Sequence, residues 1–570
     1  MAMTTESKKF HKLLTEEWRY SMEQFPEAAT AVGYPGLDDR WTDFSESAIE
    51  NRKQHTRELI KRVKKIRPQM LGPEDRLNYA LFLRQAELGV ESLAYPDELQ
   101  PITQIGGGIL ELSQTIDIMP TNKKSQYENI LLRMEKIPLF LSQIEQLMRR
   151  GLEQKITPPR ITLRDIPDQI RAHIVSDAKR SPLLKAFSKF PSQLSDPERS
   201  LLLNRAIQTY DKQVRPSFIS FLNFIEKNYI PNSRQSISWR ELPNGQSWYA
   251  LKVKESTTTE LPPQKIHDIG LTEVKRIRKL MEKEMAGSGF KGSFSEFGKF
   301  LLTDERFFFT DPALLVTGYR DIAKRADPEL SRLFGKLPRQ PYGVSAVPPY
   351  AEKSQTTAYY QHGSLASGRP GTFFANTYNL RARPKWAMEV LTLHEAVPGH
   401  HLQISLAEEL DNLPEFRRHG GYTAFVEGWA LYCEKLGYDM GFYADSYSRF
   451  GQLDYEMWRA IRLVVDTGIH DLGWSREQGL EYFRQNMVHP EHDIVVEVDR
   501  YIVWPAQALA YKIGELKIME LRSYAEKKLG DKFDIRHFHD ALLSEGALPI
   551  EILEKRMKDW IDAQVKKSGG

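Results

Sequence analysis

The stretch LTLHEAVPGHHLQ, residues 391–403, contains the residue types of a hydrolytic zinc site. His394 is followed by Glu395, which is how many zinc hydrolases begin a metal-binding helix, and the second histidine is expected four residues after the first. Position 398 holds a proline instead, and histidines follow at His400 and His401. The spacing therefore raises the question of which later histidine could share a metal ion with His394.

Helix geometry bears on the choice between the two later histidines. On a regular helix His400 lies on the wrong face, whereas His401 lies on the right face but about 10 Å further along the axis. Pro398 lacks the N–H of a regular turn and its ring crowds that turn, so the helix must bend or bulge there, and Gly399 can adopt whatever dihedral angles this needs. If these two residues loop out of the helix, His400 falls where the second ligand belongs. We therefore prefer His400 and keep His401 as the alternative, with the unused histidine available to orient a ligand.

A catalytic zinc ion takes three protein ligands and leaves one position for water. Glu427 is the candidate for the third ligand, because it lies in the apolar stretch YTAFVEGWALY, where a carboxylate needs a partner. The alternative is an exposed position on an amphipathic helix. With a single zinc ion held by His394, His400 and Glu427, the neighbouring Glu395 would act as general base on a water molecule.

The stretch MWRAIRLVVDTGIHDLGW, residues 457–474, carries polar residues on an otherwise apolar helix. Arg462, Asp466 and His470 follow one another at four-residue spacing and so share one face. One interpretation is a structural ion-pair ladder. The functional interpretation is that His470 donates a hydrogen bond to an oxyanion and Arg462 binds a substrate carboxylate.

A second stretch of this kind is DRYIVWPAQALAYKIG, residues 499–514. Gln507 and Tyr511 are four residues apart, and Arg500 lies seven residues before Gln507. In the functional interpretation Tyr511 is a further oxyanion donor, and Arg500 is the alternative to Arg462 as the group that binds a substrate carboxylate.

The bulk composition is that of a globular protein. Of the 570 residues 41% are hydrophobic and 27% charged, and the net charge of +3 gives no reason to expect nucleic-acid binding. Cys433 is the only cysteine, which excludes an internal disulfide and a cysteine-based zinc cluster. No apolar run is long enough for a membrane span. The first residues contain no apolar segment of a signal peptide, and an extracytoplasmic location with the signal replaced is slightly favoured over a cytoplasmic one.

Most of the sequence has the apolar periodicity of helices. The expected helices cover residues 6–31, 44–67, 73–91, 124–152, 197–229 and 262–286. Two segments are expected to be strands: residues 247–256, which alternate, and residues 369–379, which are short and led in by Pro-Gly. Residues 337–384 are the least helical part, and we expect this segment to be functional because it leads into the His-Glu helix. The sequence divides roughly into an N-terminal helical part, 1–260, and a C-terminal part, 261–570, with the chemistry.

Four blocks of the chain resemble a known family. They are HEAVPGHHLQ, FVEGWALYCEKLG, RLVVDTGIHDLGWS and DRYIVWPAQALAYKIG. They look like the signature blocks of the bacterial family labelled domain of unknown function 885, and the resemblance extends over nearly the whole chain. That family in turn resembles helical zinc peptidases of the thimet oligopeptidase and Taq carboxypeptidase type.

The resemblance implies a mainly α fold of two helical lobes with a deep central channel and the zinc helix at its floor. In such enzymes a short edge strand binds the peptide backbone. By similarity that strand would be GTFFANT, residues 371–377, with Phe374, Ala375 and Asn376 along the bound peptide. The inserted Pro398-Gly399 departs from the usual zinc motif, so the zinc geometry cannot be copied residue by residue.

The expected function is that of a zinc-dependent peptidase acting on oligopeptides, as a carboxypeptidase-like exopeptidase or an oligopeptidase. Glu395 would be the general base, His470 and Tyr511 would stabilise the oxyanion, and Arg462, Arg500 and Gln507 would contact substrate. Two alternatives are an amidase or esterase acting on a non-peptide substrate and a metal-binding protein without turnover.

Overall fold

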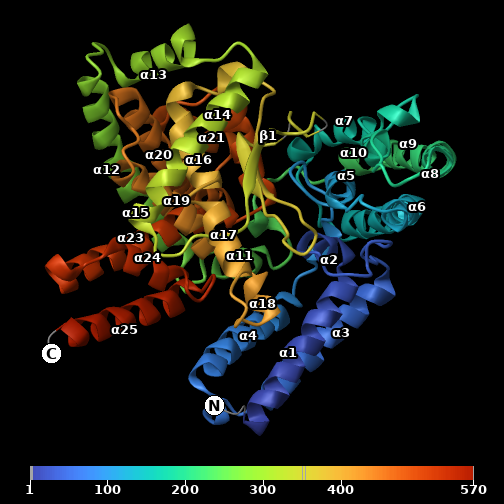
Figure 1. Ribbon diagram of the computed structural model, residues 1–570. Coiled ribbons are helices and arrows are strands. Elements are labelled where there is room, and N and C mark those ends of the chain that lie inside the picture. Colours follow the sequence, from blue (N-terminus) through green and yellow to red (C-terminus); the bar gives the residue numbers. More distant parts are fainter. Residues whose placement is uncertain (1–3, 350, 354, 569–570) are drawn as a thin grey trace. The chain divides into compact units, whose positions relative to one another are not determined.

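Helices dominate the computed structural model, which describes residues 4–349, 351–353 and 355–568 (Figure 1). Within these ranges the strands form one small sheet of three members. The prediction of a mainly α fold with a small β element is therefore confirmed.

The chain divides into two compact units. The first consists of Met1–Ser236, Ser364–Gly368 and Pro414–Phe416. The second consists of Ile237–Gly363, Arg369–Leu413 and Arg417–Gly570. The sequence suggests a division near residue 260, whereas helix α11 (Gly245–Thr257) belongs to the second unit.

The first unit is built from helices around an apolar core. They are α1 (Thr5–Gln24), α2 (Pro26–Val32), α3 (Glu46–Val63), α4 (Pro73–Ser92), α5 (Gly108–Ile118), α6 (Lys124–Gln154), α7 (Ile166–Arg171), α8 (Asp196–Thr209), α9 (Arg215–Phe224) and α10 (Ile230–Asn232). Tyr127 and Met134 of α6 pack in one core cluster with Phe218 and Phe221 of α9. The helices expected at residues 44–67, 73–91 and 124–152 are confirmed as α3, α4 and α6. The helix expected at residues 6–31 is divided into α1 and α2, and the one expected at 197–229 is divided by π-helical turns that follow α8 and α9.

The second unit contains most of the residues expected to do chemistry. Its helices are α11, α12 (Pro263–Gly287), α13 (Phe294–Thr303), α14 (Pro312–Ala326), α15 (Leu330–Leu333), α16 (Met388–Glu395), α17 (His400–Glu408), α19 (Thr423–Asp439), α20 (Ser446–His470), α21 (Arg476–Asn486), α22 (Glu491–Val503), α23 (Ala510–Leu529), α24 (Ile535–Leu543) and α25 (Ile550–Ser568). The short α18 (Glu415–Arg418) has residues in both units.

Helix α20 is buried on all sides from Phe450 to His470. Helix α12 packs along it, and α16, α19, α21, α22 and α23 also contact it. A helix surrounded in this way normally carries apolar residues around its whole circumference. Helix α20 instead buries several charged residues, and each of them needs a partner. Among the described residues, no helix combines the length and the apolar character needed to cross a bilayer.

The strand expected at residues 247–256 is wrong, because these residues lie in α11. Trp248, Tyr249, Leu251 and Val253 are all buried. Because α11 packs against α19 and α23, its apolar residues cover more than one face and leave no clear helical period to read. The alternating pattern of apolar residues therefore results from burial of more than one face of the helix and does not indicate a strand.

The sheet lies just before the helix that carries His394 and Glu395. Its strands are β1 (Tyr342–Ala346), β2 (Ala358–Gln361) and β3 (Gly371–Ala375). The strand predicted near residues 369–379 is confirmed, but its expected position at the edge of the sheet is wrong. The order is β1-β3-β2, with β1 parallel and β2 antiparallel to β3. Both edges of β3 are therefore paired already, and a peptide cannot add to it.

A buried network of ion pairs joins four helices of the second unit. Its members are Glu273 and Arg276 of α12, Lys435 of α19, Glu456 of α20, and Lys512 and Glu515 of α23. The Lys512 ammonium lies 2.7 Å from Glu456, 2.9 Å from Glu515 and 3.0 Å from Glu273, and its side chain is fully buried. Three cations balance three carboxylates, so removal of one cation leaves a buried negative charge uncompensated.

We therefore expect Lys512→Met to lower the free energy of unfolding by about 3–5 kcal/mol, as the loss of one partner of a buried ion pair does. Lys517→Met is the matched control on the same helix, because Lys517 pairs with Glu520 and Glu554 at a partly exposed position. Its effect should stay below about 1 kcal/mol. Urea unfolding followed by circular dichroism measures both, and equal losses would contradict a special role for the buried network.

Candidate metal centre

The helix that begins with the His-Glu pair is broken in the middle of the motif. Helix α16 ends at Glu395 and α17 begins at His400, with residues 396–399 between them. A Cβ atom at Gly399 would lie 1.9 Å from the backbone oxygen of His394, so this close approach requires glycine. The indole N–H of Trp429, on α19, donates a hydrogen bond of 2.9 Å to the backbone oxygen of Pro398. The break is thus held by a contact with another helix.

The break brings His400 next to His394 and Glu427. The Nε2 atoms of His394 and His400 lie 3.6 Å and 3.3 Å from Oε2 of Glu427. The three potential ligand atoms all lie within 4.8 Å of one another. Ligand atoms about 2.0–2.2 Å from a tetrahedral zinc ion are separated by about 3.3–3.6 Å. The donor set of two imidazoles and one carboxylate, and the two distances from the carboxylate to the imidazoles, therefore fit zinc.

The two histidines are the neighbours that can balance the negative charge of the Glu427 carboxylate. Its Oε2 atom is buried and makes no aligned hydrogen bond with the described residues, although both histidines are close. Burial raises the pKa of Glu427, but the neighbouring His400 and His394 lower it well below its ordinary value. A buried, ionised carboxylate oxygen facing two imidazole nitrogens suits a cation.

His401 lies in a different environment from His400. Its Nε2–H donates a hydrogen bond of 3.0 Å to the backbone oxygen of Gln340, and its Nδ1 accepts one of 2.8 Å from the Tyr360 hydroxyl. Burial lowers the pKa of His401 to about 4, so the ring is neutral at neutral pH. Both nitrogens are engaged, which leaves none for a metal ion. The structure thus supports His400 over the alternative.

His394 is oriented by a residue that the sequence did not single out. Its Nδ1–H donates a hydrogen bond of 2.8 Å to Oε1 of Glu434, which leaves Nε2 facing Glu427. The Arg459 guanidinium lies 3.2 Å from the same Glu434 oxygen. Although burial lowers the pKa of His394, the nearby carboxylates of Glu427 and Glu434 raise it to about 9. Glu434 follows Glu427 by seven residues, or two helical turns, and this spacing could have revealed it.

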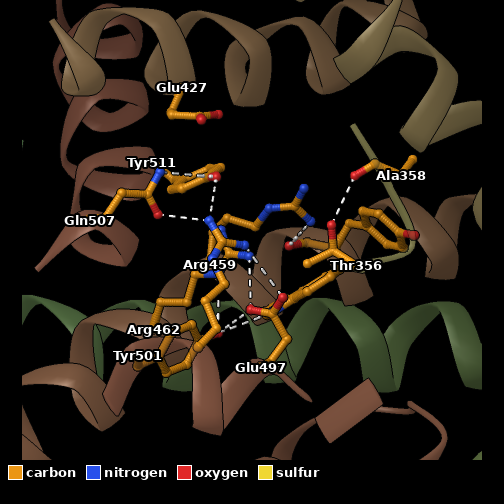
Figure 2. A network of polar contacts seen from close by, with 12 residues as sticks. Thr356, Ala358, Glu427, Arg459, Arg462, Glu497, Tyr501, Gln507 and Tyr511 are labelled. Atoms are coloured by element: carbon orange, nitrogen blue, oxygen red, sulfur yellow. Dashed lines mark hydrogen bonds and ion pairs between the residues drawn. The ribbon is translucent and has the colours of Figure 1, made fainter. Parts of the chain in front are cut away.

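Tyr511 lies beside the three potential ligands. Its ring is stacked with the His394 ring at 6.2 Å between centroids. Its hydroxyl oxygen accepts a hydrogen bond of 3.0 Å from Nη2 of Arg500. It also accepts one of 3.4 Å from Nε2 of Gln507 (Figure 2). The same Arg500 nitrogen donates to Oε1 of Gln507 at 2.7 Å. The expected contact residues thus form one connected group around the phenol.

Arg462 belongs to the same network but not to the expected ladder. It donates hydrogen bonds of 3.0 Å to Glu497 and 3.1 Å to the Tyr501 hydroxyl, and its guanidinium lies 4.3 Å from the centroid of the Tyr511 ring (Figure 2). Burial raises the pKa of Glu497, but Arg462 and Arg500 lower it to about 2. Two buried arginines thus share one carboxylate, and this part of the site has an excess positive charge.

His470 makes its described hydrogen bonds outside the site, and the hydrogen bonds described for Arg462, Asp466 and His470 do not join these residues into a ladder. His470 accepts a hydrogen bond from the backbone N–H of Trp239 at Nδ1 and donates one to the backbone oxygen of Tyr501. It therefore has no hydrogen left for an oxyanion, and its predicted role is wrong. Asp466 accepts hydrogen bonds from the Tyr249 hydroxyl and the backbone N–H of Ala506.

The residues expected to contact the peptide backbone have structural roles instead. The Asn376 amide donates hydrogen bonds to three backbone oxygens, those of Glu352, Gln355 and Thr356. Phe374 is stacked on Tyr359 of β2, and Ala375 is fully buried. Their predicted contact with substrate is wrong, because β3 is the central strand.

Helices α19 and α23 approach each other closely at two glycines. A Cβ atom at Gly514 would lie 1.8 Å from the backbone oxygen of Ala424, and one at Gly428 would lie 2.6 Å from the Gly514 backbone. Gly428 follows Glu427, and Gly514 is three residues after Tyr511. The glycine contact therefore brings the carboxylate and the phenol of these two helices to one site.

We expect His400→Ala to abolish zinc binding, because it removes one of three ligands, whereas His401→Gln should retain it. Elemental analysis of the purified variants after zinc loading and dialysis measures the metal content. Circular dichroism shows whether each variant is folded. Full zinc retention by a folded His400→Ala variant would contradict the assignment.

Glu434→Gln should weaken zinc affinity about 10- to 100-fold, as the loss of a carboxylate behind a ligating histidine does. Competition with a chromophoric chelator measures the affinity. Asp439→Asn is the matched control, since Asp439 lies on the same helix but pairs with Arg522. Unchanged affinity in Glu434→Gln would show that the hydrogen bond to His394 has no influence on the metal.

The chain is similar to solved structures that are described as putative lipoproteins. One is described as "The crystal structure of the putative lipoprotein from Colwellia psychrerythraea"; it is 26% identical, has a TM-score of 0.91, and the match covers 99% of this chain and 100% of that one. Another is described as a "putative lipoprotein of unknown function from Shewanella oneidensis", with 16% identity, a TM-score of 0.69 and coverage of 97% and 100%. The second likeness shows the fold alone.

No curated protein matches the chain. Residues 26–557 match the family described as "Bacterial protein of unknown function (DUF885)". This match extends over nearly the whole chain and includes all residues of the candidate metal centre, so the chain belongs to the DUF885 family.

Proposed function

We propose that the protein is a zinc-dependent peptidase that hydrolyses peptide bonds of oligopeptides, as a carboxypeptidase-like exopeptidase or an oligopeptidase. The observation that carries the proposal is the approach of two imidazole nitrogens to a buried carboxylate oxygen at 3.3 Å and 3.6 Å, next to Glu395. His394, His400 and Glu427 would hold the ion. A zinc ion bound there would act as a Lewis acid and lower the pKa of a water molecule toward neutrality.

Glu395 has the role of proton carrier in this proposal. It directly follows His394, at the end of α16, and the residue is 7% exposed. Glu395 takes the proton of the attacking water and then passes it to the leaving amine. The Tyr511 hydroxyl donates a hydrogen bond to the oxyanion that develops on the substrate carbonyl.

The outer edge of β2 is the better place for a bound peptide backbone than β3. The backbone N–H of Asn376 donates a hydrogen bond to the backbone oxygen of Thr357. Hydrogen-bonded and non-hydrogen-bonded pairs alternate along an antiparallel pair of strands, so the backbone N–H and C=O groups of Ala358 and Tyr360 point away from β3. Strand β2 contacts α16, and the Tyr360 ring lies 6.5 Å from that of His400. A peptide added to this edge would run past the candidate ligands.

Arg462 and Arg500 together carry one positive charge more than Glu497, and their field favours substrates with a free C-terminal carboxylate without a direct contact from Arg500. This charge supports the carboxypeptidase-like mode within the proposal. The similar structure from Colwellia psychrerythraea is described as a "putative lipoprotein", and we therefore also propose an extracytoplasmic location for this protein.

The test of the function is Glu395→Gln together with removal of the metal. The variant should retain zinc and lose hydrolysis of a fluorogenic peptide library by more than about 100-fold, because the proton carrier is gone. The wild-type protein should lose activity with a chelator and regain it with added zinc. A fully active Glu395→Gln variant would falsify the proposal, and a zinc-loaded wild type inactive on all peptides would favour a metal-binding protein without turnover.

A further inference from the structure

The hydroxyl of Tyr511 can still donate one hydrogen bond. A phenol oxygen accepts up to two hydrogen bonds and donates one. Both acceptor positions are filled, by Arg500 at 3.0 Å and Gln507 at 3.4 Å. Among the described residues, the Tyr511 hydrogen has no acceptor, although the residue is only 6% exposed. The hydroxyl is therefore left as a donor to a bound molecule.

Arg500 and Gln507 form a closed group with this phenol. Nη2 of Arg500 donates both to Gln507 at 2.7 Å and to Tyr511, so its two hydrogens are used within the protein. The guanidinium is held in turn by Glu497 at 3.4 Å, and it lies 5.6 Å from the centroid of the Trp504 ring. A charged donor in such a fixed position makes a stronger hydrogen bond than a neutral one.

The backbone before Gln507 is fixed as well. Ala506 has a left-handed conformation, with φ of 66°, which a residue with a side chain adopts only when it is held there. The carboxylate of Asp466, on the buried helix α20, accepts the Ala506 N–H at 3.0 Å and 3.1 Å. Helix α20 thus sets the position of Gln507, and through it the direction of the Tyr511 hydroxyl.

We propose that Arg500 and Gln507 are positioning residues that direct the Tyr511 hydrogen toward the substrate oxyanion, and that they do not bind the substrate themselves. This inference rests on the proposed function. It replaces the expectation that these two residues contact substrate, because both Nη2 hydrogens of Arg500 and one amide hydrogen of Gln507 are bound within this group.

The test is a double-mutant cycle with Tyr511→Phe, measured on a peptide with a free C-terminus and on its amidated form. Tyr511→Phe should lower kcat about 100- to 1,000-fold, as the loss of an oxyanion donor does. Gln507→Leu and Arg500→Lys should each lower kcat about 10- to 100-fold with little change in KM, and equally on both peptides. Combined with Tyr511→Phe, neither should cause a further loss, because the hydroxyl they direct is absent.

A second readout does not depend on turnover. The zinc-loaded Gln507→Leu variant should bind a phosphinic peptide, whose charged oxygens resemble the oxyanion, about tenfold or more weakly than the wild type by calorimetry. Arg476→Met is the control, because Arg476 pairs with Asp499 of the same helix as Arg500 but has no bond to Tyr511. Its kcat and its phosphinate affinity should stay within about twofold of the wild type.

The outcomes separate this inference from the proposed function. Additive losses in the Tyr511→Phe background would overturn the positioning role. A rise in KM confined to the free-acid peptide would also overturn it, because Arg500 would then be a carboxylate receptor. Inactivity of the zinc-loaded wild type on every peptide would end the proposed function instead, and this is seen before any variant is compared.

Discussion

The second unit depends on the pairing of charges that are buried around helix α20. A charge removed from water is tolerated only with a partner of opposite sign and aligned hydrogen bonds. Glu456 meets this requirement through Lys512 and Lys435, and Arg462 through Glu497. Each pair joins α20 to a different neighbour, so the pairing specifies how the helices are arranged as well as which side chains lie inside.

The same constraint connects the framework to the candidate metal centre. Arg459 of α20 contacts the Glu434 oxygen that also accepts the hydrogen of His394. Asp466 of α20 holds the backbone before Gln507. One buried helix therefore supports the imidazole on one side of the site and the phenol on the other, although it supplies none of the three potential ligands.

Local spacing was enough to predict much of the fold and part of the site. Amphipathic helices such as α3 and α12 have one apolar face, and their periodicity shows it. The His-Glu pair, the glutamate in an apolar stretch and the proline that breaks the helix are likewise readable from neighbours in the chain. The choice of His400 followed from a break in the helix that Pro398 demands locally.

The errors arose where distant contacts decide the outcome. Helix α11 is buried on more than one side, so no single face marked it as a helix. The central place of β3 depends on β1 and β2, which the sequence did not reveal as strands. Histidine is a common catalytic residue type, but the partners of His470 are backbone groups of Trp239 and Tyr501, which are distant in the sequence. Hydrogen bonds to backbone leave no trace in residue type.

The broken motif also differs from an unbroken one in whether its two histidines would keep their spacing in another protein. In a continuous helix, two histidines four residues apart share a face wherever the helix is placed, because the helix itself sets their spacing. Here the spacing depends on Trp429 holding the Pro398 carbonyl and on the room that Gly399 leaves beside His394. A peptide of residues 388–408 alone would lack that support. The pair of histidines is thus a property of the packed protein, and a designer who wished to graft it would have to carry α19 along.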